Sequence, residues 1–354
     1  MRVRLVVAPN GYSFTNQARS LEQGLLSLGV DAGIGSGFPH PEVVVGVGSW
    51  RDYEVLVTEP LREKTVKVVP WIVSDDKVDG WVSELNQLPM ILTTSRHCQS
   101  IMVRDGINPD RIKTLPEAVD SEFWQPLSPE ELKPINDLLS IADKDSPFKY
   151  NLGLLKKSGV PILFTTGGDA TSKGAQEVIQ ALGSIYESSG NKQWLYLIKT
   201  WPAAGSLRRS AEELDLAASL GIWENIRYVV GEFSQDFMRG LMNLCDIYAA
   251  PSRGEGFGLP LVEAAMCSKP VLTCQGTAAS ETVIHGSTGW IAQSITDNGG
   301  SKADVKDLAG YLQKLLTDSQ MRKNMGELGR QKAIERYSPQ VIAQKFINLI
   351  NEAK

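Results

Sequence analysis

The segment from residue 246 to residue 265 constrains this chain most, because it contains a strand, a loop and a helix in immediate succession. The apolar run 246–249 predicts a buried strand. A helix is expected to begin near Pro260, since proline fits the first helical position, where its missing N–H would have no partner. The loop between them contains three glycines. Glycine lets a ligand approach the backbone, and the free N–H groups of a helix start bind anions. The segment therefore predicts an anion-binding loop at the end of a strand.

Two carboxylates frame this loop. Glu255 lies within the loop, and Glu263 follows eight residues later, about one turn into the helix. A phosphate cradle with a carboxylate on each side suits a ligand that carries phosphates and hydroxyls together. A nucleotide sugar offers a diphosphate, ribose hydroxyls and sugar hydroxyls, so the sequence predicts a nucleotide-sugar site.

Strands and helices alternate along the chain, which is the pattern of parallel α/β layers. A first series of strands is predicted at 5–8, 43–47, 54–58, 66–73, 90–94 and 112–115, and a second at 161–165, 194–199, 226–230, 246–250 and 270–274. The segment between the two series is rich in Pro, Asp, Lys and Ser, which is typical of a linker or insertion. A length of 354 residues also favours two domains. The last forty residues have a helical period that is interrupted at Arg336–Pro339.

Composition excludes several classes of site. A formal net charge of −5 argues against nucleic acid as the main partner. A local basic patch could still meet an anionic membrane, so peripheral contact at the inner membrane face stays open. The four cysteines and three histidines lack metal-ligand spacing, and free thiols favour the cytoplasm. The apolar run at the N-terminus is too short for a signal peptide or a membrane span.

The spacing of Glu255 and Glu263 resembles the E-x7-E motif of retaining GT-B glycosyltransferases of the family 4 type. The resemblance continues through the segments 267–273, 280–283 and 286–290, and upstream through 93–95, 106–107 and 112–123. It implies the GT-B fold, in which two Rossmann-like α/β domains face each other across a cleft. The implied parts are an acceptor-side domain (1–125), a linker or insertion (126–157), a nucleotide-sugar domain (158–335) and a C-terminal helix crossing back to the first domain (336–354).

The resemblance also implies roles for individual residues. Glu263 would accept hydrogen bonds from the ribose hydroxyls, since both carboxylate oxygens are acceptors. Glu255 and Lys173 are the predicted catalytic residues, Glu255 beside the sugar and the acceptor, and Lys173 beside the donor diphosphate. The remaining predicted donor-binding residues are backbone or pocket positions: Gly256, Phe257, Gly258, Leu259, Gly167, Gly168, Gly11 and Glu281.

Two positions depart from the family pattern. Gly168 stands where family members carry an arginine that grips the diphosphate, and Lys199 or Arg253 could supply the missing cation. No histidine follows the strand at 69–73, where many members have one that contacts the transferred sugar. Ser74 or Asp75 could face the cleft there, or the aspartates could form an ordinary polar turn.

The resemblance thus implies a metal-independent, retaining hexosyltransferase without a cofactor, which moves a sugar from a nucleotide-sugar donor to an acceptor hydroxyl. The acceptor is a sugar, a lipid-linked molecule or a small molecule, and the donor base is left open. Two alternatives remain. The first is a non-catalytic GT-B-like protein that binds sugar nucleotides. The second is a phosphorylase or epimerase of the same shape.

Overall fold

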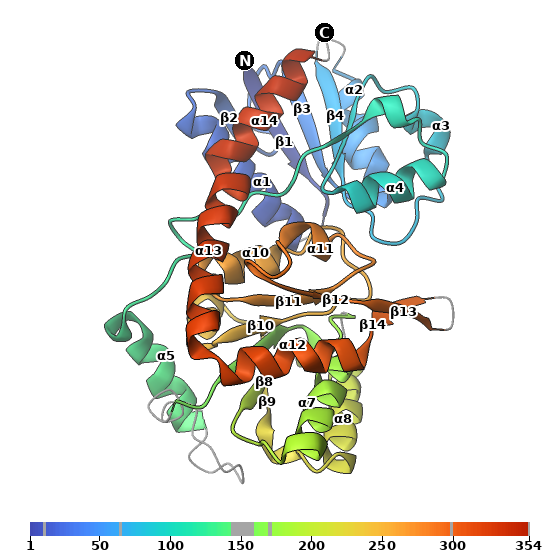
Figure 1. The fold of residues 1–354 in the computed structure, drawn as a ribbon. Helices are drawn as coiled ribbons and strands as arrows, with labels where there is room; N and C mark the ends of the chain where they lie inside the picture. Colours follow the sequence, from blue (N-terminus) through green and yellow to red (C-terminus); the bar gives the residue numbers. More distant parts are fainter. Residues whose placement is uncertain (10–11, 64–65, 143–158, 169–171, 298–299, 353–354) are drawn as a thin grey trace. The chain divides into compact units, whose positions relative to one another are not determined.

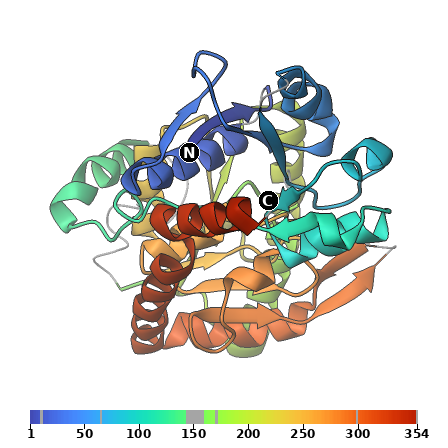
Figure 2. The same cartoon turned by 90° about the horizontal axis from the view of Figure 1, so that it is seen from above.

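A computed structural model describes the chain in six stretches, residues 1–9, 12–63, 66–142, 159–168, 172–297 and 300–352. Its contacts divide the chain into two compact units (Figures 1 and 2). The first unit comprises Met1–Phe123, Glu255–Leu259 and Ala333–Lys354. The second comprises Trp124–Gly254 and Pro260–Lys332.

The first unit is built on a parallel sheet of six strands in the order β2-β1-β3-β4-β5-β6. The strands are β1 (Arg2–Val7), β2 (Asp31–Ile34), β3 (Val43–Gly48), β4 (Lys67–Ile72), β5 (Ile91–Thr93) and β6 (Ile112–Thr114). Every residue of β3 is buried. A continuous apolar run of this kind is typical of a parallel strand with both faces covered.

Helices cover both faces of this sheet. They are α1 (Tyr12–Ser27), α2 (Glu59–Leu61), α3 (Val82–Leu85), α4 (Arg96–Arg104) and α14 (Pro339–Glu352), with short turns η1 (Trp50–Asp52), η2 (Glu54–Thr58) and η3 (Pro109–Arg111). The C-terminal helix α14 packs beside α1, which Figures 1 and 2 both show. The two backbones approach closely at Gly24, where a Cβ would lie 2.1 Å from the carbonyl oxygen of Pro339. Glycine at this position is therefore required by helix packing.

The predicted strand at 54–58 is wrong, because these residues form the π-helical turn η2. Leu56 and Val57 are adjacent in sequence and both are buried, which a strand with one exposed face would not allow. Gly46 and Gly48 of β3 leave space for this turn, since a Cβ at Gly48 would lie 2.8 Å from Leu56 Cδ1. The turn therefore lies on a face of the sheet instead of extending it.

The second unit contains another parallel sheet of six strands, in the order β12-β11-β10-β7-β8-β9. The strands are β7 (Ile162–Thr166), β8 (Leu195–Thr200), β9 (Ile226–Val230), β10 (Ile247–Ala249), β11 (Val271–Cys274) and β12 (Gly289–Ala292). An antiparallel hairpin, β13 (Ser294–Asp297) and β14 (Gly300–Ala303), follows the last strand. The strand order reverses between β7 and β10, and open α/β sheets bind ligands at the carboxyl ends of strands at such a point.

The helices of the second unit are α5 (Pro129–Ala142), α7 (Ala175–Ser189), α8 (Ala204–Ser219), α9 (Gln235–Leu244), α10 (Leu259–Met266), α11 (Ala279–Thr282) and α12 (Val305–Thr317), with the turn η5 (Trp223–Asn225). Helix α13 (Ser319–Tyr337) leads out of this unit and ends at the interruption that the sequence predicts. Helix α5 lies in the predicted linker and insertion, whose residues 143–157 fall outside the described stretches. The prediction of two Rossmann-like α/β sheets is confirmed.

Candidate functional site

The loop between β10 and α10 is held in place at Gly256. The Gly256 carbonyl oxygen accepts hydrogen bonds from Thr94 Oγ1 (2.7 Å), Ser95 Oγ (2.9 Å) and Cys98 Sγ (3.2 Å). A Cβ at Gly256 would lie 2.4 Å from Val73 Cγ1, so only glycine fits. Three donors on one carbonyl therefore fix the orientation of this peptide, which lies beside the predicted catalytic residue Glu255.

The rest of this loop is ordered by packing and backbone geometry. Phe257 is buried and meets the ring of Tyr337 edge-on, with centroids 5.5 Å apart. Gly258 has a φ of 100°, a left-handed conformation that favours glycine. The side chains of Glu255 and Leu259 remain partly exposed. The segment thus combines an anchored backbone with an accessible carboxylate.

Glu263 lies in α10 and belongs to the second unit. The residue is only partly exposed, and burial raises the pKa of its carboxyl from 4.5 to about 8. Among the described residues, none donates a hydrogen bond to this carboxyl group. An acidic group without protein donors is suited to receive hydroxyl donors from a ligand.

The loop after β7 carries the predicted residues Gly167, Gly168 and Lys173. Gly167 and Gly168 both have positive φ, 102° and 52°, and the Lys173 amide donates to the Gly168 carbonyl at 3.1 Å. At the end of this loop, a Cβ on Gly174 would lie 2.3 Å from the Pro251 carbonyl oxygen. The loops after β7 and β10 are therefore in close contact at the switch point of the second sheet. Gly11 lies outside the described residues.

Arg253 is already engaged within the second unit. Its guanidinium forms an ion pair with the buried carboxylate of Glu177. Arg253 Nη2 donates to both carboxylate oxygens, at 2.8 Å to Oε1 and 2.7 Å to Oε2. Its backbone amide also donates to the Ser172 carbonyl at 2.8 Å. Arg253 therefore ties the two loops together, and its charge is balanced by Glu177.

Glu281 lies in the short helix α11, in the second unit. Its side chain is partly exposed. The preceding turn contains Gly276, whose φ of 90° favours glycine. The structure thus places Glu281 on a turn after β11, another strand of the same sheet.

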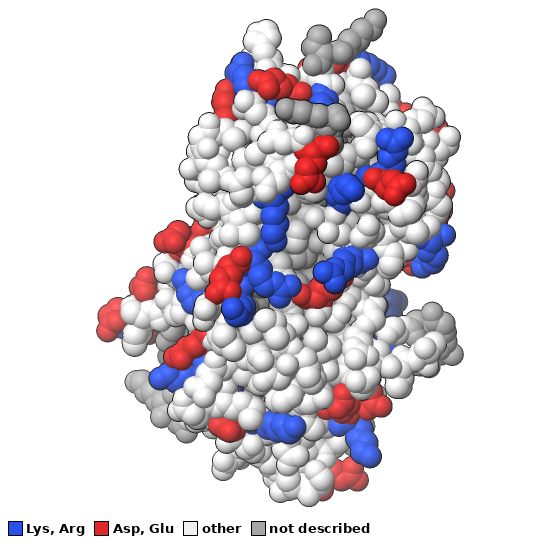
Figure 3. Space-filling view, turned by 45° about the horizontal axis from the view of Figure 1, so that its top comes forward, with Lys and Arg blue, Asp and Glu red and all other residues white. Residues whose placement is uncertain are grey.

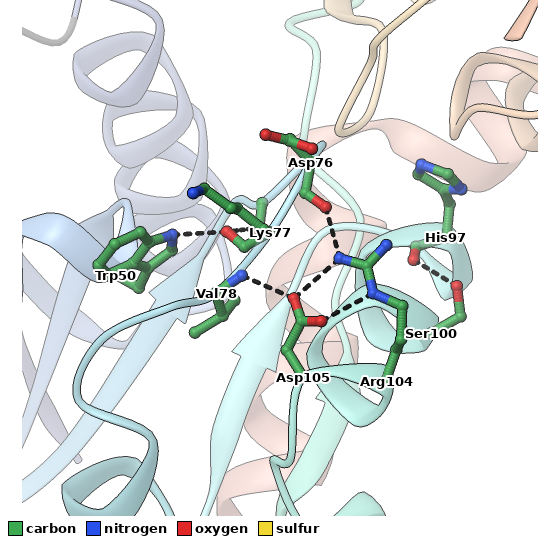
Figure 4. A network of polar contacts seen from close by, with 9 residues as sticks. Trp50, Asp76, Lys77, Val78, His97, Ser100, Arg104 and Asp105 are labelled. Carbon is green, nitrogen blue, oxygen red and sulfur yellow. Dashed lines mark hydrogen bonds and ion pairs between the residues drawn. The ribbon is translucent and has the colours of Figure 1, made fainter. Parts of the chain in front are cut away.

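The turn after β4 is where the family histidine is missing. Ser74 Oγ donates to the Lys77 carbonyl at 3.0 Å. Trp50 Nε1 donates to the same oxygen at 2.7 Å (Figure 4). Arg104 donates to the Asp76 carbonyl at 2.7 Å. These contacts fix the turn and engage the Ser74 hydroxyl within it.

Asp75 lies in the same turn and is exposed. The Asp75 Cβ lies 3.9 Å from the position that a Cβ on Gly256 would take. Of the two replacements considered for the histidine, Asp75 therefore lies next to the anchored loop, whereas Ser74 is used inside its own turn.

The predicted residues that the structure describes divide between the two units. Glu255, Gly256, Phe257, Gly258 and Leu259 belong to the first unit, with residues 73–75 and 94–98 around Gly256. Gly167, Gly168, Lys173, Glu263 and Glu281 belong to the second unit. Sequence reasoning missed the donors on the Gly256 carbonyl, because nothing in the segment 93–95 shows which distant peptide it contacts.

Two other kinds of feature, a metal site and a membrane span, are absent from the described residues. No group of three or more His, Cys, Asp or Glu side chains there could hold a metal ion. No helix in the described stretches is both long and apolar enough to cross a membrane. Acidic and basic side chains are interspersed on the face that Figure 3 shows.

Comparison with known proteins identifies the family. Residues 153–332 match the model of the glycosyl transferases group 1, which is half of the chain. The chain belongs to this family. It is 28% identical over 179 residues to the capsular polysaccharide biosynthesis glycosyltransferase CapM of Staphylococcus aureus, a match covering 51% of this chain and 43% of CapM. It is 25% identical over 268 residues to an MMP alpha-(1->4)-mannosyltransferase of Mycolicibacterium hassiacum, covering 75% of this chain and 55% of that enzyme. The chain thus spans about half the length of these relatives.

Among solved structures, the group 1 chain is similar to Anabaena HepE in complex with UDP, with a TM-score of 0.75 and 15% identity over 99% of this chain and 100% of HepE. HepE has also been solved with UDP-glucose. Sucrose-phosphate synthase of Thermosynechococcus elongatus gives a TM-score of 0.72 at 15% identity, over 99% of both chains. These likenesses show that the fold is GT-B.

Proposed function

We propose that this protein is a retaining glycosyltransferase that moves a hexosyl group from a nucleotide-sugar donor to an acceptor hydroxyl without a metal ion. The observation that carries this proposal is the carboxyl of Glu263, which lies in α10 without a hydrogen-bond donor among the described residues. Membership of the group 1 glycosyltransferases supports a transfer reaction. HepE, which has the same fold, binds UDP and UDP-glucose.

In this proposal the ribose hydroxyls donate to Glu263, and the amides of Gly256, Phe257 and Gly258 bind hydroxyls of the transferred sugar. The anchored Gly256 peptide favours this role, because donors held in a fixed orientation lose little entropy when a ligand binds. Glu255 lies next to that peptide. A carboxylate at this position would stabilise the positive charge that develops on the sugar as its bond to the diphosphate breaks.

Lys173 is proposed to neutralise the departing diphosphate. A lysine ammonium is a compact point charge with three donors, and it binds phosphate in many proteins. Its loop carries two glycines with positive φ after β7, and glycine would allow a ligand to approach the backbone closely there. Positive charge from this lysine and from backbone amides takes the part that a divalent ion has in metal-dependent transfer.

The acceptor is proposed to be a hydroxyl of a sugar, a lipid-linked molecule or a small molecule. We also propose a cytoplasmic location, which is supported by four buried cysteines that are all free thiols.

A thermal-shift screen with UDP-, GDP-, ADP- and dTDP-sugars tests the donor class. A ligand at a hundred times its Kd stabilises a protein by about 2.7 kcal/mol, which is readily measured. Hydrolysis or transfer of the stabilising donor would then be followed with a set of hydroxyl acceptors. Binding without turnover would favour a non-catalytic nucleotide-sugar protein, an outcome consistent with the missing arginine and histidine. Absence of stabilisation by every donor would refute the proposal.

A further inference from the structure

Lys199, at the carboxyl end of β8, is a buried residue whose ammonium has no hydrogen-bond or ion-pair partner among the described residues. The residue is 5% exposed, and its Nζ lies 3.6 Å from the centroid of the Trp201 ring. Among the described residues, none accepts a hydrogen bond from this ammonium or forms an ion pair with it. Burial lowers the pKa of Lys199 from 10.5 to about 8, although the charge of Glu232 opposes this shift. A buried charge is costly unless it is paired, so this side chain is suited to an anionic ligand.

Thr166, at the end of the neighbouring strand β7, is a second residue whose polar group has no partner in the described part of the chain. Its Oγ1 is buried and has no hydrogen-bond partner within the described part of the chain. Thr166 and Lys199 are register partners in adjacent parallel strands. Side chains of such partners point to the same face of a sheet. A hydroxyl and an ammonium therefore lie side by side, and together they offer up to four hydrogens to an oxygen ligand.

This pair adjoins the loop that carries Lys173. The Gly167 amide donates to the Lys199 carbonyl at 2.8 Å, and the Lys173 amide donates to the Gly168 carbonyl. The alternative cation, Arg253, is already paired with Glu177. The end of β8 therefore offers a cation that forms no ion pair with any carboxylate of the described stretches.

We propose that Lys199 and Thr166 form an anion subsite for the diphosphate of the nucleotide-sugar donor, with Lys199 as the second cation beside Lys173. This inference rests on the proposed function, because it names residues that hold the donor of that reaction. When the sugar leaves, negative charge grows on the diphosphate, and a fixed ammonium in a poorly solvated position stabilises it strongly.

The test compares Lys199→Met with Lys192→Met in the full chain. Lys192 is a matched control, since its Nζ also lies over an aromatic ring, 4.2 Å from the centroid of Tyr186. Lys192 precedes the first residue of β8, whereas Lys199 lies at the carboxyl end of that strand. Isothermal titration measures the affinity for UDP, GDP, ADP and dTDP and for the corresponding nucleosides. We expect Lys199→Met to weaken binding of the preferred diphosphate about 10- to 100-fold, the effect of losing a hydrogen bond to a charged group. Nucleoside affinity and the control variant should be unchanged.

Thermal melting without ligand separates a binding role from a structural one. The Lys199 ammonium has no ion pair among the described residues, and methionine keeps an unbranched side chain that can contact the Trp201 ring, so Lys199→Met should melt no lower than the wild type. A lower melting temperature together with unchanged diphosphate affinity would overturn the inference. Thr166→Val keeps the shape of the side chain, and we expect it to weaken diphosphate binding several-fold, which tests the subsite even if Lys199→Met fails to fold.

The outcomes distinguish the subsite from the proposed function. Failure of the wild type to bind any nucleoside diphosphate would refute both. Wild-type binding that is equally tight in Lys199→Met and Thr166→Val would refute the subsite alone and leave the donor site elsewhere at the sheet edge.

Discussion

Replacing Glu263 by glutamine should change how the stability of the unliganded protein depends on pH. The folded protein holds the carboxyl proton up to a pKa of about 8, whereas the ordinary value is 4.5. The folded state therefore binds more protons than the unfolded state between these values, and the free energy of unfolding falls as the pH rises from 4.5 to 8. At about 1.4 kcal/mol per pH unit the effect is at most about 5 kcal/mol. Solvent contact of the partly exposed side chain lowers the real value.

Urea denaturation at a series of pH values between 5 and 8 measures this effect. The wild type should lose stability relative to Glu263→Gln as the pH rises, because the neutral amide has no proton to release. If the free energy of unfolding changed with pH in the same way in both proteins, the raised pKa of Glu263 would be contradicted. The proposal that this carboxyl group binds a ligand would then lose its support.

The same reasoning applies to nucleotide binding. Ribose hydroxyls donate to the ionised carboxylate and lower its pKa, so binding should release a proton and affinity should rise from pH 5 to pH 8. Titration in two buffers of different ionisation enthalpy counts that proton. Glu263→Ala should cost roughly 1.5–3 kcal/mol for the nucleotide and for the nucleotide sugar alike. A loss seen only with the sugar attached would show that Glu263 contacts the sugar instead.

Four further outcomes are expected. Glu255→Gln should change donor affinity by no more than a few-fold and lower kcat by about 100-fold, or about 3 kcal/mol. If the kcat of this variant equals that of the wild type, Glu255 has only a structural role in its loop. Turnover should persist in excess EDTA, and its loss with recovery on adding magnesium or manganese would establish a metal requirement. Arg253→Met should cost about 3 kcal/mol in urea denaturation, since the buried carboxylate of Glu177 loses its partner; unchanged stability would mean that water replaces the arginine. Thr94→Val should lower kcat more than it raises KM for the donor, because the Gly256 peptide loses a hydrogen bond that fixes its orientation. Thr94→Ser keeps the hydroxyl and should retain activity. Equal losses in the two variants would show that the hydroxyl does not matter for catalysis.

The sequence by itself determined the α/β class and the strand, loop and helix around residues 246–265. These features depend on local chemistry, since apolar runs predict buried strands, and glycine and proline mark the loop and the start of α10. It also predicted the interruption near Ser338, where α13 ends at Tyr337 and α14 begins at Pro339. The prediction of a strand at 54–58 failed for the same local reason, because a run of three apolar residues fits a strand or a helical turn equally well until packing decides.

Only the tertiary structure decided which polar groups form hydrogen bonds or ion pairs within the protein and which are left to bind a ligand. Thr94 and the Gly256 carbonyl are 162 residues apart, and Arg253 and Glu177 are 76 residues apart, so no local pattern links them. The pairing of Arg253 removes one candidate cation. The register of β7 against β8 sets Lys199 beside Thr166. Among the described residues, the Thr166 hydroxyl has no hydrogen-bond partner, and the Lys199 ammonium has no hydrogen-bond or ion-pair partner. Burial and pairing depend on residues that are distant in sequence, and for this reason the choice between Arg253 and Lys199 could not be made from the sequence.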